Sequence, residues 1–377
     1  MFLFDSFALV SLAAYALIVL ITLASAPASD RSQRQSLALV TAGTALAYAA
    51  ASPWVFFAGW TISVLPIWLD RSYGALARAI QLLSVLVLAL ALVWQGSGTA
   101  FLLMVLAVTL RKGVFPFHFW IPSAFEKGSL PVLNLLLNGH LGAYLMIRFA
   151  VPLYPEAAAQ HLSLLGVLAI STSVYGAVVA LVAYKPRRVL ALLCASQAAF
   201  ILAGLENRNV EGITGALLHW WVVAFATTAL LAVYRAVEAR TTEAESPQGF
   251  LGLAFHAPRL AVFFAVAAVA LVGLPGTLGF AAEDLLFHGS LESHPLLGVG
   301  LPLATALNAI TALRLVATLF FGRRGIHVPP IPDAFPRERF ALTLPIFLLV
   351  AGGIFPAVLV ALRTPVAENV ARLLAGN

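Results

Sequence analysis

A small set of ionisable side chains lies within long apolar runs of this sequence. An ionised group in hydrocarbon costs several kcal/mol, so it usually marks an ion path or a paired structural site. Histidine gains and loses protons near neutral pH, and a shielded carboxyl can also exchange them, so proton transfer is the chemistry that this set suits best. The residues are Arg111, Lys112, His118, His140, Arg148, His219, Glu283, Asp284 and Arg314.

Arg111 and Lys112 open the segment RKGVFPFHFWIP, which ends at Pro122. Gly113 and Pro116 disfavour a regular helix here, because proline lacks a backbone donor and crowds the preceding turn. A broken helix exposes backbone polar groups, which a bilayer tolerates only beside protein or water. The segment therefore predicts an interior break. The alternative is a helix end at the membrane interface, where both basic side chains reach toward the headgroups.

His140 lies in the apolar run 130–149, and two asparagines precede it on the same chain segment. Asn134 and Asn138 are four residues apart, so a helix would place their side chains on one face. A polar stripe that leads to a histidine suits a proton relay. The alternative is a hydrogen-bonded core histidine without a role in transport.

His219 precedes two tryptophans inside another apolar run. The histidine could take part in transport for the same reason as His140. A His-Trp-Trp cluster near the end of a span also suits the aromatic belt at a membrane interface. Both interpretations stay open at the level of sequence.

Glu283 and Asp284 follow the stretch GLPGTLGF, in which Pro275 and three glycines interrupt any helix. A carboxyl just beyond a break inside the membrane could bind and release protons. The alternative is an ordinary external loop. Arg314 lies within a later apolar run and is a candidate ionic partner for one of these acids.

The elements that must position these residues are membrane helices. The sequence is 61% hydrophobic and 10% charged, which leaves too little polar surface for a water-soluble domain. Apolar runs of about 17–25 residues match a hydrocarbon core of about 30 Å, and no period-two alternation is present. We predict an all-α, polytopic transmembrane helical bundle that forms one domain over residues 1–377. The expected spans, about twelve, are 3–25, 36–51, 53–69, 77–96, 99–121, 130–150, 163–183, 187–204, 211–235, 258–276, 298–320 and 341–361.

The distribution of basic residues predicts the orientation. Arg and Lys concentrate in alternate loops, which the positive-inside rule places in the cytoplasm, so both termini are expected outside it. The lipid bilayer, and not nucleic acid, therefore accounts for the net charge of +6. We predict a multi-pass protein of a bacterial inner membrane. The opposite loops contain Arg208 as their one Lys or Arg residue, and they are 97–98, 151–162, 205–210 and 277–297.

The loops leave no room for a soluble domain. The longest cytoplasmic ones, 236–257 and 322–340, are short, and no glycine-rich nucleotide loop is present, which argues against catalysis within this chain. No cofactor is expected either, since Cys194 is the only cysteine and lies in an apolar run. Residues 2–26 have an acid and no preceding base, so they are expected to be a membrane helix and not a signal peptide.

Three motifs in order, the first of them in two parts, resemble one family. FPFHFWIP, GAYLMIRF, YKPRRVLALLCASQAAFILAG and GLPGTLGFAAEDLLFHG are similar to segments of the antiporter-like subunits of respiratory complex I and of Mrp antiporters. The resemblance covers about residues 50–325. It implies broken helices, a central line of buried charged residues, translocation of protons or another cation, and partner subunits in a membrane complex.

The resemblance also implies roles for single residues. The family's lysine before FPxHxW falls on Arg111 or Lys112, and a lysine before the closing Arg-Phe falls on His140. The bridging lysine or glutamate after the Gly-Pro break falls on Glu283. A histidine of the later half falls at or near His219.

Other positions depart from the family. The glutamate that follows Gly-Trp in complex I subunits is Thr61 here, the aspartate of Asp-x-Lys-Arg is Lys185, and a lysine after the later histidine is lost near Thr228. Redox-driven pumping as in complex I is therefore not implied.

Gly-Trp-Thr at 59–61 and Asp70-Arg71 resemble the membrane subunits of DAB-type inorganic-carbon pumps. That resemblance implies a large soluble zinc protein on the cytoplasmic face that would hydrate CO₂, with ion flow in this chain. Zinc would then belong to the partner. A third hypothesis is a membrane anchor that conducts no ions.

Overall fold

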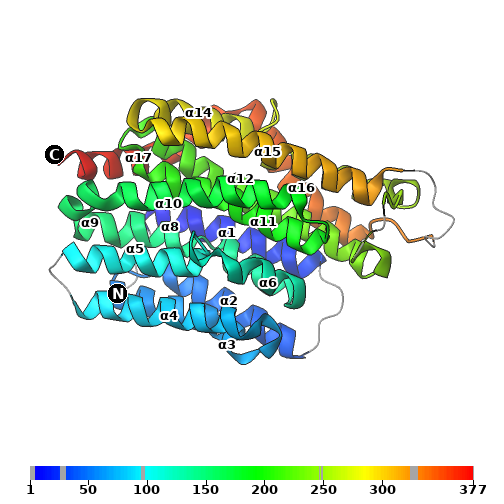
Figure 1. Ribbon diagram of the computed structural model, residues 1–377, viewed down its shortest axis with the longest axis horizontal. Coiled ribbons are helices and arrows are strands. Elements are labelled where there is room, and N and C mark those ends of the chain that lie inside the picture. The colour runs from blue at the N-terminus through cyan, green and yellow to red at the C-terminus, as the bar shows by residue number, and fades with distance from the viewer. Residues whose placement is uncertain are drawn as a thin grey trace.

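A computed structural model describes residues 5–25, 31–94, 98–245, 247, 249–322 and 330–376. Within these residues the chain is helical and contains no β-strand, which confirms the all-α prediction. Eight helical segments are long and apolar enough to cross a membrane, or nine if one bent pair counts as a span. The prediction of twelve spans was approximate. The helices lie roughly along one direction and form an elongated bundle (Figure 1).

In the described part of the chain eight unbroken helices form most of the bundle. Prolines open several of them because the first helical turn needs no backbone donor there. The Asn209 side chain caps one by accepting from the backbone N–H of Gly212 at 2.8 Å. The helices are α1 (Ser6–Ser25), α2 (Arg31–Tyr48), α3 (Pro53–Leu69), α4 (Gly74–Val93), α10 (Pro155–Val182), α11 (Pro186–Gly204), α12 (Val210–Glu238) and α15 (Pro295–Phe320). Six of them, all except α2 and α3, belong to the long apolar segments.

Helices α2 and α3 are two separate helices packed against each other. Their backbones approach closely at Gly43 and Gly59, where an added Cβ on Gly59 would lie 2.6 Å from the carbonyl oxygen of Gly43. Small residues allow such close helix contacts in membranes, where hydrophobic burial drives little association. The chain turns between the two helices near Ser52, so the segment is a hairpin and not one bent span.

Three helix pairs among the described residues are interrupted, and two of them, within Gly98–Lys127 and Leu130–Leu153, belong to the long apolar segments. The expected break after Lys112 is confirmed, and the expected external loop 277–297 was wrong, since most of it forms α14 and completes the span that α13 begins. The missed helix has acids in its first half, which lowers the apolarity on which the prediction depended. The interrupted pairs are α5 (Gly98–Lys112) with α6 (Trp120–Lys127), α7 (Leu130–Asn138) with α8 (Leu141–Leu145), and α13 (Pro258–Leu271) with α14 (Leu278–Ser293).

The last two helices meet at a sharp bend. Helix α16 (Pro336–Ile354) and helix α17 (Pro356–Ala375) are inclined by 88° to each other. Sequence predicted one straight span over 341–361, and the bend at Phe355 falls inside that range. Helix α17 returns the chain to α12, which lies at the centre of the bundle and contacts α1, α7, α11, α13, α14, α16 and α17.

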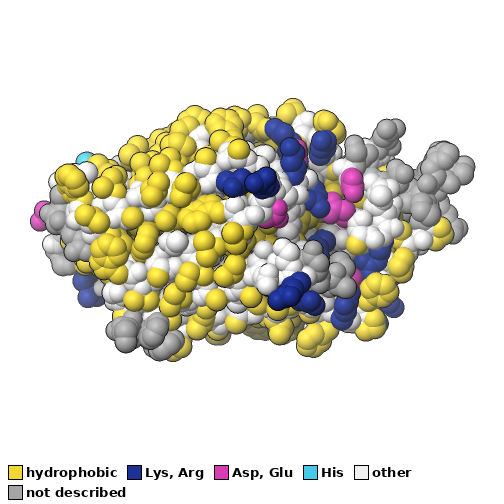
Figure 2. All heavy atoms as spheres, turned by 90° about the horizontal axis from the view of Figure 1, so that it is seen from below, with side chains coloured by type: hydrophobic (Ala, Val, Ile, Leu, Met, Phe, Trp, Pro, Cys, Tyr) yellow, Lys and Arg dark blue, Asp and Glu magenta, His cyan; other side chains and the backbone are white. Residues whose placement is uncertain are grey.

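The two ends of the bundle differ in charge. Lys and Arg side chains lie mainly in the right half of Figure 2, beyond a largely apolar surface. Several are fixed in ion pairs, such as Arg187 Nε with Glu238 Oε1 at 2.6 Å and Arg240 Nη2 with Glu338 Oε2 at 2.7 Å. Both termini lie at the opposite end (Figure 1). The positive-inside rule assigns the basic end to the cytoplasm.

Candidate functional site

Each of the three interrupted spans carries one of the predicted residues at or near its break. Lys112 ends α5, His140 separates α7 from α8, and Glu283 lies in the second turn of α14. The backbone at His140 is left-handed, with φ 41°. A non-glycine residue costs about 1 kcal/mol or more there, so the surrounding structure must hold it in place. Such strain gathers at functional sites and makes His140 the first candidate.

Lys112 and His140 form a direct contact inside the protein. The Lys112 Nζ lies 3.2 Å from His140 Nδ1 and donates to the carbonyl oxygen of Leu137 at 2.9 Å. The two side chains are 8% and 1% exposed. With Lys112 charged, His140 Nδ1 must be the unprotonated nitrogen that accepts its hydrogen bond. Transfer of the shared proton from Lys112 to Nδ1 gives a neutral amine and an imidazolium. The pair can therefore hold one proton on either residue.

Arg111 is also inside, but it points to a different helix. Its Nη1 donates to the carbonyl oxygen of Trp60 at 3.1 Å, and its Nη2 donates to the Ser63 hydroxyl at 2.7 Å. The guanidinium lies 4.2 Å above the Trp60 ring. Burial of both basic residues rules out the interfacial alternative. Among the described residues neither basic side chain forms an ion pair. Thr61, at the position where the resemblance implies a glutamate, donates to the carbonyl oxygen of Phe57 in its own helix at 2.9 Å.

A polar network leads from the basic end to the break at His140. The predicted stripe is confirmed, because Asn138 Nδ2 donates to Asn134 Oδ1 at 2.7 Å. Thr227 accepts from Asn138 at 2.7 Å, and Thr228 donates to Asn134 Oδ1 at 3.2 Å. Asn134 Nδ2 in turn donates to the Thr22 hydroxyl of α1 at 2.9 Å.

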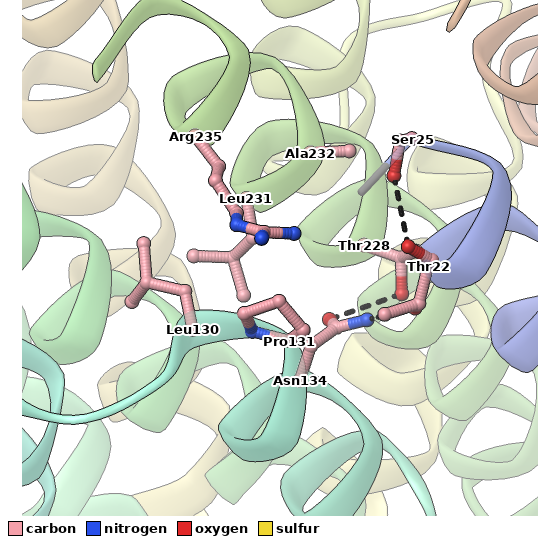
Figure 3. Close-up of a pocket in the computed structure, with 9 residues that line it drawn as sticks. All are labelled: Thr22, Ser25, Leu130, Pro131, Asn134, Thr228, Leu231, Ala232 and Arg235. Atoms are coloured by element: carbon pink, nitrogen blue, oxygen red, sulfur yellow. Dashed lines mark hydrogen bonds between the residues drawn. The ribbon is translucent and has the colours of Figure 1, made fainter. Parts of the chain in front are cut away.

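This network borders a small cavity. Figure 3 shows the side chains of Asn134, Thr22 and Thr228 on one side and Arg235 reaching toward them from α12. The cavity volume is about 10 Å³, which is close to the space that one water needs. A water there would extend the hydrogen-bonded chain toward the basic end.

His219 lies in the middle of the bundle and not at an interface. Its side chain is fully buried, and neither ring nitrogen has a hydrogen-bond partner among the described residues. The amide of Gln197 on α11 is buried and likewise without a partner there. The ring of Trp220, the residue after His219, packs 5.4 Å from that of His140. The aromatic-belt interpretation was therefore wrong.

A second polar cluster joins α10, α11 and α15 beyond His219. Asn308 Nδ2 donates to the Ser196 hydroxyl at 2.8 Å, and Ser196 donates to the carbonyl oxygen of Ser173 at 2.8 Å. The Asn308 Oδ1 has no partner in the described part of the chain. Sequence reasoning missed this cluster, because isolated Ser and Asn residues inside apolar helices carry little signal.

Glu283 borders a cavity of about 370 Å³ between α11, α14 and α15. Its Oε2 accepts from the Thr305 hydroxyl at 3.0 Å, whereas its shielded Oε1 has no partner among the described residues. Gly273 in the break packs against the carboxyl, since a Cβ there would lie 2.6 Å from Oε2. The residue lies in a broken span, so the external-loop alternative was wrong.

Asp284 and Arg314 are not part of the buried set formed by Lys112, His140, His219 and Glu283. The Asp284 side chain is 51% exposed and lies 3.5 Å from His288 Nδ1. Arg314 donates to the carbonyl oxygens at the C-terminal end of α10, with Nη1 2.7 Å from Leu181 O. The predicted ion pair between Arg314 and an acid is absent from the described residues, and a helix-capping role explains its position.

Sequence reasoning also missed a buried arginine. Arg363 of α17 is 1% exposed, and its guanidinium lies 3.9 Å from the centre of the Trp221 ring. Among the described residues its Nε and Nη2 have no partner. The predicted last span ended at 361, which left this residue outside the membrane.

Residues 68–308 match a family described as "NADH:quinone oxidoreductase/Mrp antiporter, TM". NAD(P)H-quinone oxidoreductase chain 4 1 of Synechococcus elongatus is 30% identical over 343 residues, covering 80% of this chain and 64% of that protein. NADH-quinone oxidoreductase subunit N 2 of Aquifex aeolicus is 30% identical over 277 residues, covering 72% of this chain and 56% of that protein. The chain thus spans about 56–64% of the length of these relatives.

Solved structures share the fold. One chain of respiratory complex I from Thermus thermophilus has a TM-score of 0.84 and 24% identity over 99% of this chain and 86% of its own. One chain of the Mrp complex from Dietzia sp. DQ12-45-1b has a TM-score of 0.86 and 19% identity, with 98% and 84% covered. Together with the family match over more than half of the sequence, the interrupted spans identify this chain as a member of the family of antiporter-like membrane subunits of NADH:quinone oxidoreductases and Mrp antiporters.

Proposed function

We propose that this chain translocates protons through the membrane as one subunit of a larger complex. The observation that carries the proposal is the 3.2 Å contact between Lys112 Nζ and His140 Nδ1 at a helix break inside the bundle. Two nitrogen bases that share one proton form a loading site, because a small movement decides which of them holds it. The Asn134 and Asn138 side chains line the proton's approach to the pair, where water and the threonine hydroxyls are the carriers, and the proton leaves through His219 toward Glu283.

The same groups argue for protons over sodium. Hard cations such as Na⁺ need several oxygen ligands, whereas the loading site offers nitrogen and two neighbouring positive side chains. Arg111 is fixed to α3 by two hydrogen bonds and keeps its charge, so it repels a metal cation from the pair. A proton avoids this repulsion, because it moves along hydrogen bonds and takes the place of the proton that the Lys112–His140 pair has released.

Proton flux through the parent protein tests the proposal. The purified chain, with any subunits that accompany it, is placed in vesicles that contain a pH-sensitive dye, and a potassium diffusion potential drives the flux. We expect acidification well above that of protein-free vesicles, and the same rate when sodium is omitted. A rate equal to that of empty vesicles, or a strict need for sodium, contradicts proton translocation.

We also propose that the working form includes other subunits and a large soluble protein on the cytoplasmic face. The basic end offers an open cavity of about 390 Å³ with charges of both signs, including Lys185, Arg187 and Glu245. Mixed charges at a membrane surface suit a polar docking interface. Thr61 supplies no carboxylate to Arg111, which departs from complex I subunits and agrees with the resemblance to DAB-type pumps. The second candidate function is therefore that ion flow in this chain drives CO₂ hydration by a soluble zinc partner.

Purification at low salt from the native membrane distinguishes these partners. We expect the chain to leave the membrane together with at least one soluble subunit. Zinc in that subunit supports the inorganic-carbon candidate, and iron–sulfur or quinone-binding subunits support a redox complex. A chain that purifies alone and transports at the full rate contradicts both.

A further inference from the structure

A second pair of titratable side chains lies at the end of the bundle that carries the termini. Glu206 belongs to a short 3₁₀ turn, Leu205–Asn207, directly after α11, and His294 is the single residue between α14 and α15. The His294 Nε2 lies 3.9 Å from Glu206 Oε1. Neither residue belongs to the Lys112–His140 pair or to the Glu283 cavity.

Glu206 is buried although it lies near the surface of the bundle. The residue is 4% exposed, and its Oε2 has no hydrogen-bond partner among the described residues. Gly166 on α10 makes room for it, since a Cβ there would lie 1.6 Å from Oε2. A shielded carboxyl without a donor is unfavourable as a purely structural element. The His294 side chain is 32% exposed, so the pair reaches from the interior to water.

The other groups around Glu206 have partners of their own. Asn207 Nδ2 donates to the Ser290 hydroxyl of α14 at 2.9 Å. Arg208 is exposed, and its guanidinium donates to the carbonyl oxygen of Ala159 on α10. Arg208 still lies close enough to act on the Glu206 carboxyl through its charge. Within the described part of the chain, His294 is the titratable side chain that lies within 4.0 Å of that carboxyl.

The pair lies on the same helices as the Glu283 cavity. Helix α14 carries Glu283 and, seven residues later, Ser290, which corresponds to about 10 Å along a helix. Helix α11 carries Phe200 in the wall of that cavity and ends next to Glu206. The pair therefore follows the cavity in the direction of the end with the termini.

We propose that Glu206 and His294 form a proton port between the Glu283 cavity and water at the face that carries the termini. The inference deepens the proposed function and rests on it. A neutral Glu206 carboxyl gives its proton to Nε2 of His294, which leaves a carboxylate and an imidazolium. Nε2 of the imidazolium then gives this proton to water at the surface, since Nδ1 is shielded and has no partner among the described residues. Rotation of the partly exposed ring shortens the 3.9 Å separation by about 1 Å to hydrogen-bond distance.

Two variants test the port in the vesicle assay for proton flux. Glu206→Gln keeps the size of the side chain but carries no exchangeable acid proton, and we expect a loss of about tenfold or more. His294→Ala is expected to show a similar loss, and added imidazole is expected to restore at least half of the flux. Glu211→Gln is the matched control, because Glu211 is an exposed acid on the same face.

Each outcome decides the question. Parental flux in both variants overturns the port and leaves the proposed function standing. A loss in His294→Ala that imidazole does not restore also overturns it, since the histidine would then act only through packing. An absence of flux in the parent overturns the proposed function and the port together. Because His294 is partly exposed, its truncation keeps the test valid if Glu206→Gln fails to fold.

Discussion

Glu283→Gln is expected to lower proton flux about 100-fold or more while the protein still folds and assembles. The amide keeps the size of the carboxyl, and its oxygen can still accept from Thr305, which now lies at 3.0 Å. It cannot hold a transferable acid proton, and removal of such a group from a proton-transfer step typically costs two to four powers of ten in rate. The measurements are vesicle acidification and thermal unfolding in detergent.

The adjacent acid provides the comparison. Asp284→Asn is expected to retain at least half of the flux, because its carboxylate is half exposed and faces His288 although the residue reaches the wall of the same cavity. Equal losses in the two variants would mean that the cavity needs negative charge in general. Normal flux in Glu283→Gln with normal assembly would remove the carboxyl from the path.

Helix breaks were predictable from sequence where glycine and proline mark them. Gly113 with Pro116, and Pro275 with its neighbouring glycines, cannot continue a helix, and both breaks are present. The break at His140 has a weaker signal, a single preceding glycine. Its left-handed backbone follows from tertiary contacts, such as the Tyr48 hydroxyl that donates to the carbonyl oxygen of Gly139.

Side-chain direction was harder to predict than position along the chain. Glu283 and Asp284 are neighbours in sequence and both reach the wall of the cavity, but successive residues of a helix point about 100° apart, so the Asp284 carboxylate is half exposed and the Glu283 carboxyl is shielded. Arg314 lies in a span, as expected, but it caps α10 instead of pairing with an acid. Arg363 was missed because the bend at Phe355 turns its helix back against α12. These outcomes depend on which helices become neighbours, which one sequence does not specify.

The buried residues from Lys112 to Glu283 form two groups that differ in charge, so the two groups are expected to act differently on a proton. The half at Lys112 contains bases and the fixed Arg111, with no acid paired to them among the described residues. The half at Glu283 contains a carboxyl and hydroxyl groups but no basic partner there. Under the proposed function, a proton on the Lys112–His140 pair would lie in a region that already repels positive charge and would be driven toward the carboxyl. On that proposal the buried His219 would be the intermediate carrier, since its ring packs 5.3 Å from that of Phe200 in the wall of the Glu283 cavity.

The two neighbouring bases, Arg111 and Lys112, are expected to respond in opposite ways to exchange of their side chains. Lys112→Arg is expected to reduce proton flux about 100-fold, because a guanidinium keeps the charge but does not release its proton. Arg111→Lys is expected to keep most of the flux, since its role is a fixed charge. It should lose about 1–2 kcal/mol of stability with one of the two bonds to Trp60 and Ser63. Flux and unfolding temperature measure both effects.

A double variant completes this test of the pair. If Lys112 and His140 share one proton, Lys112→Gln with His140→Gln should transport no more slowly than either single variant, because each single change already disables the unit. Losses that multiply would show that the two residues act in separate steps. The reverse pattern for the exchanges, with Arg111→Lys inactive and Lys112→Arg active, would assign the loading site to Arg111. The family's lysine position would then fall on Arg111, against the structural role that its two hydrogen bonds to α3 indicate.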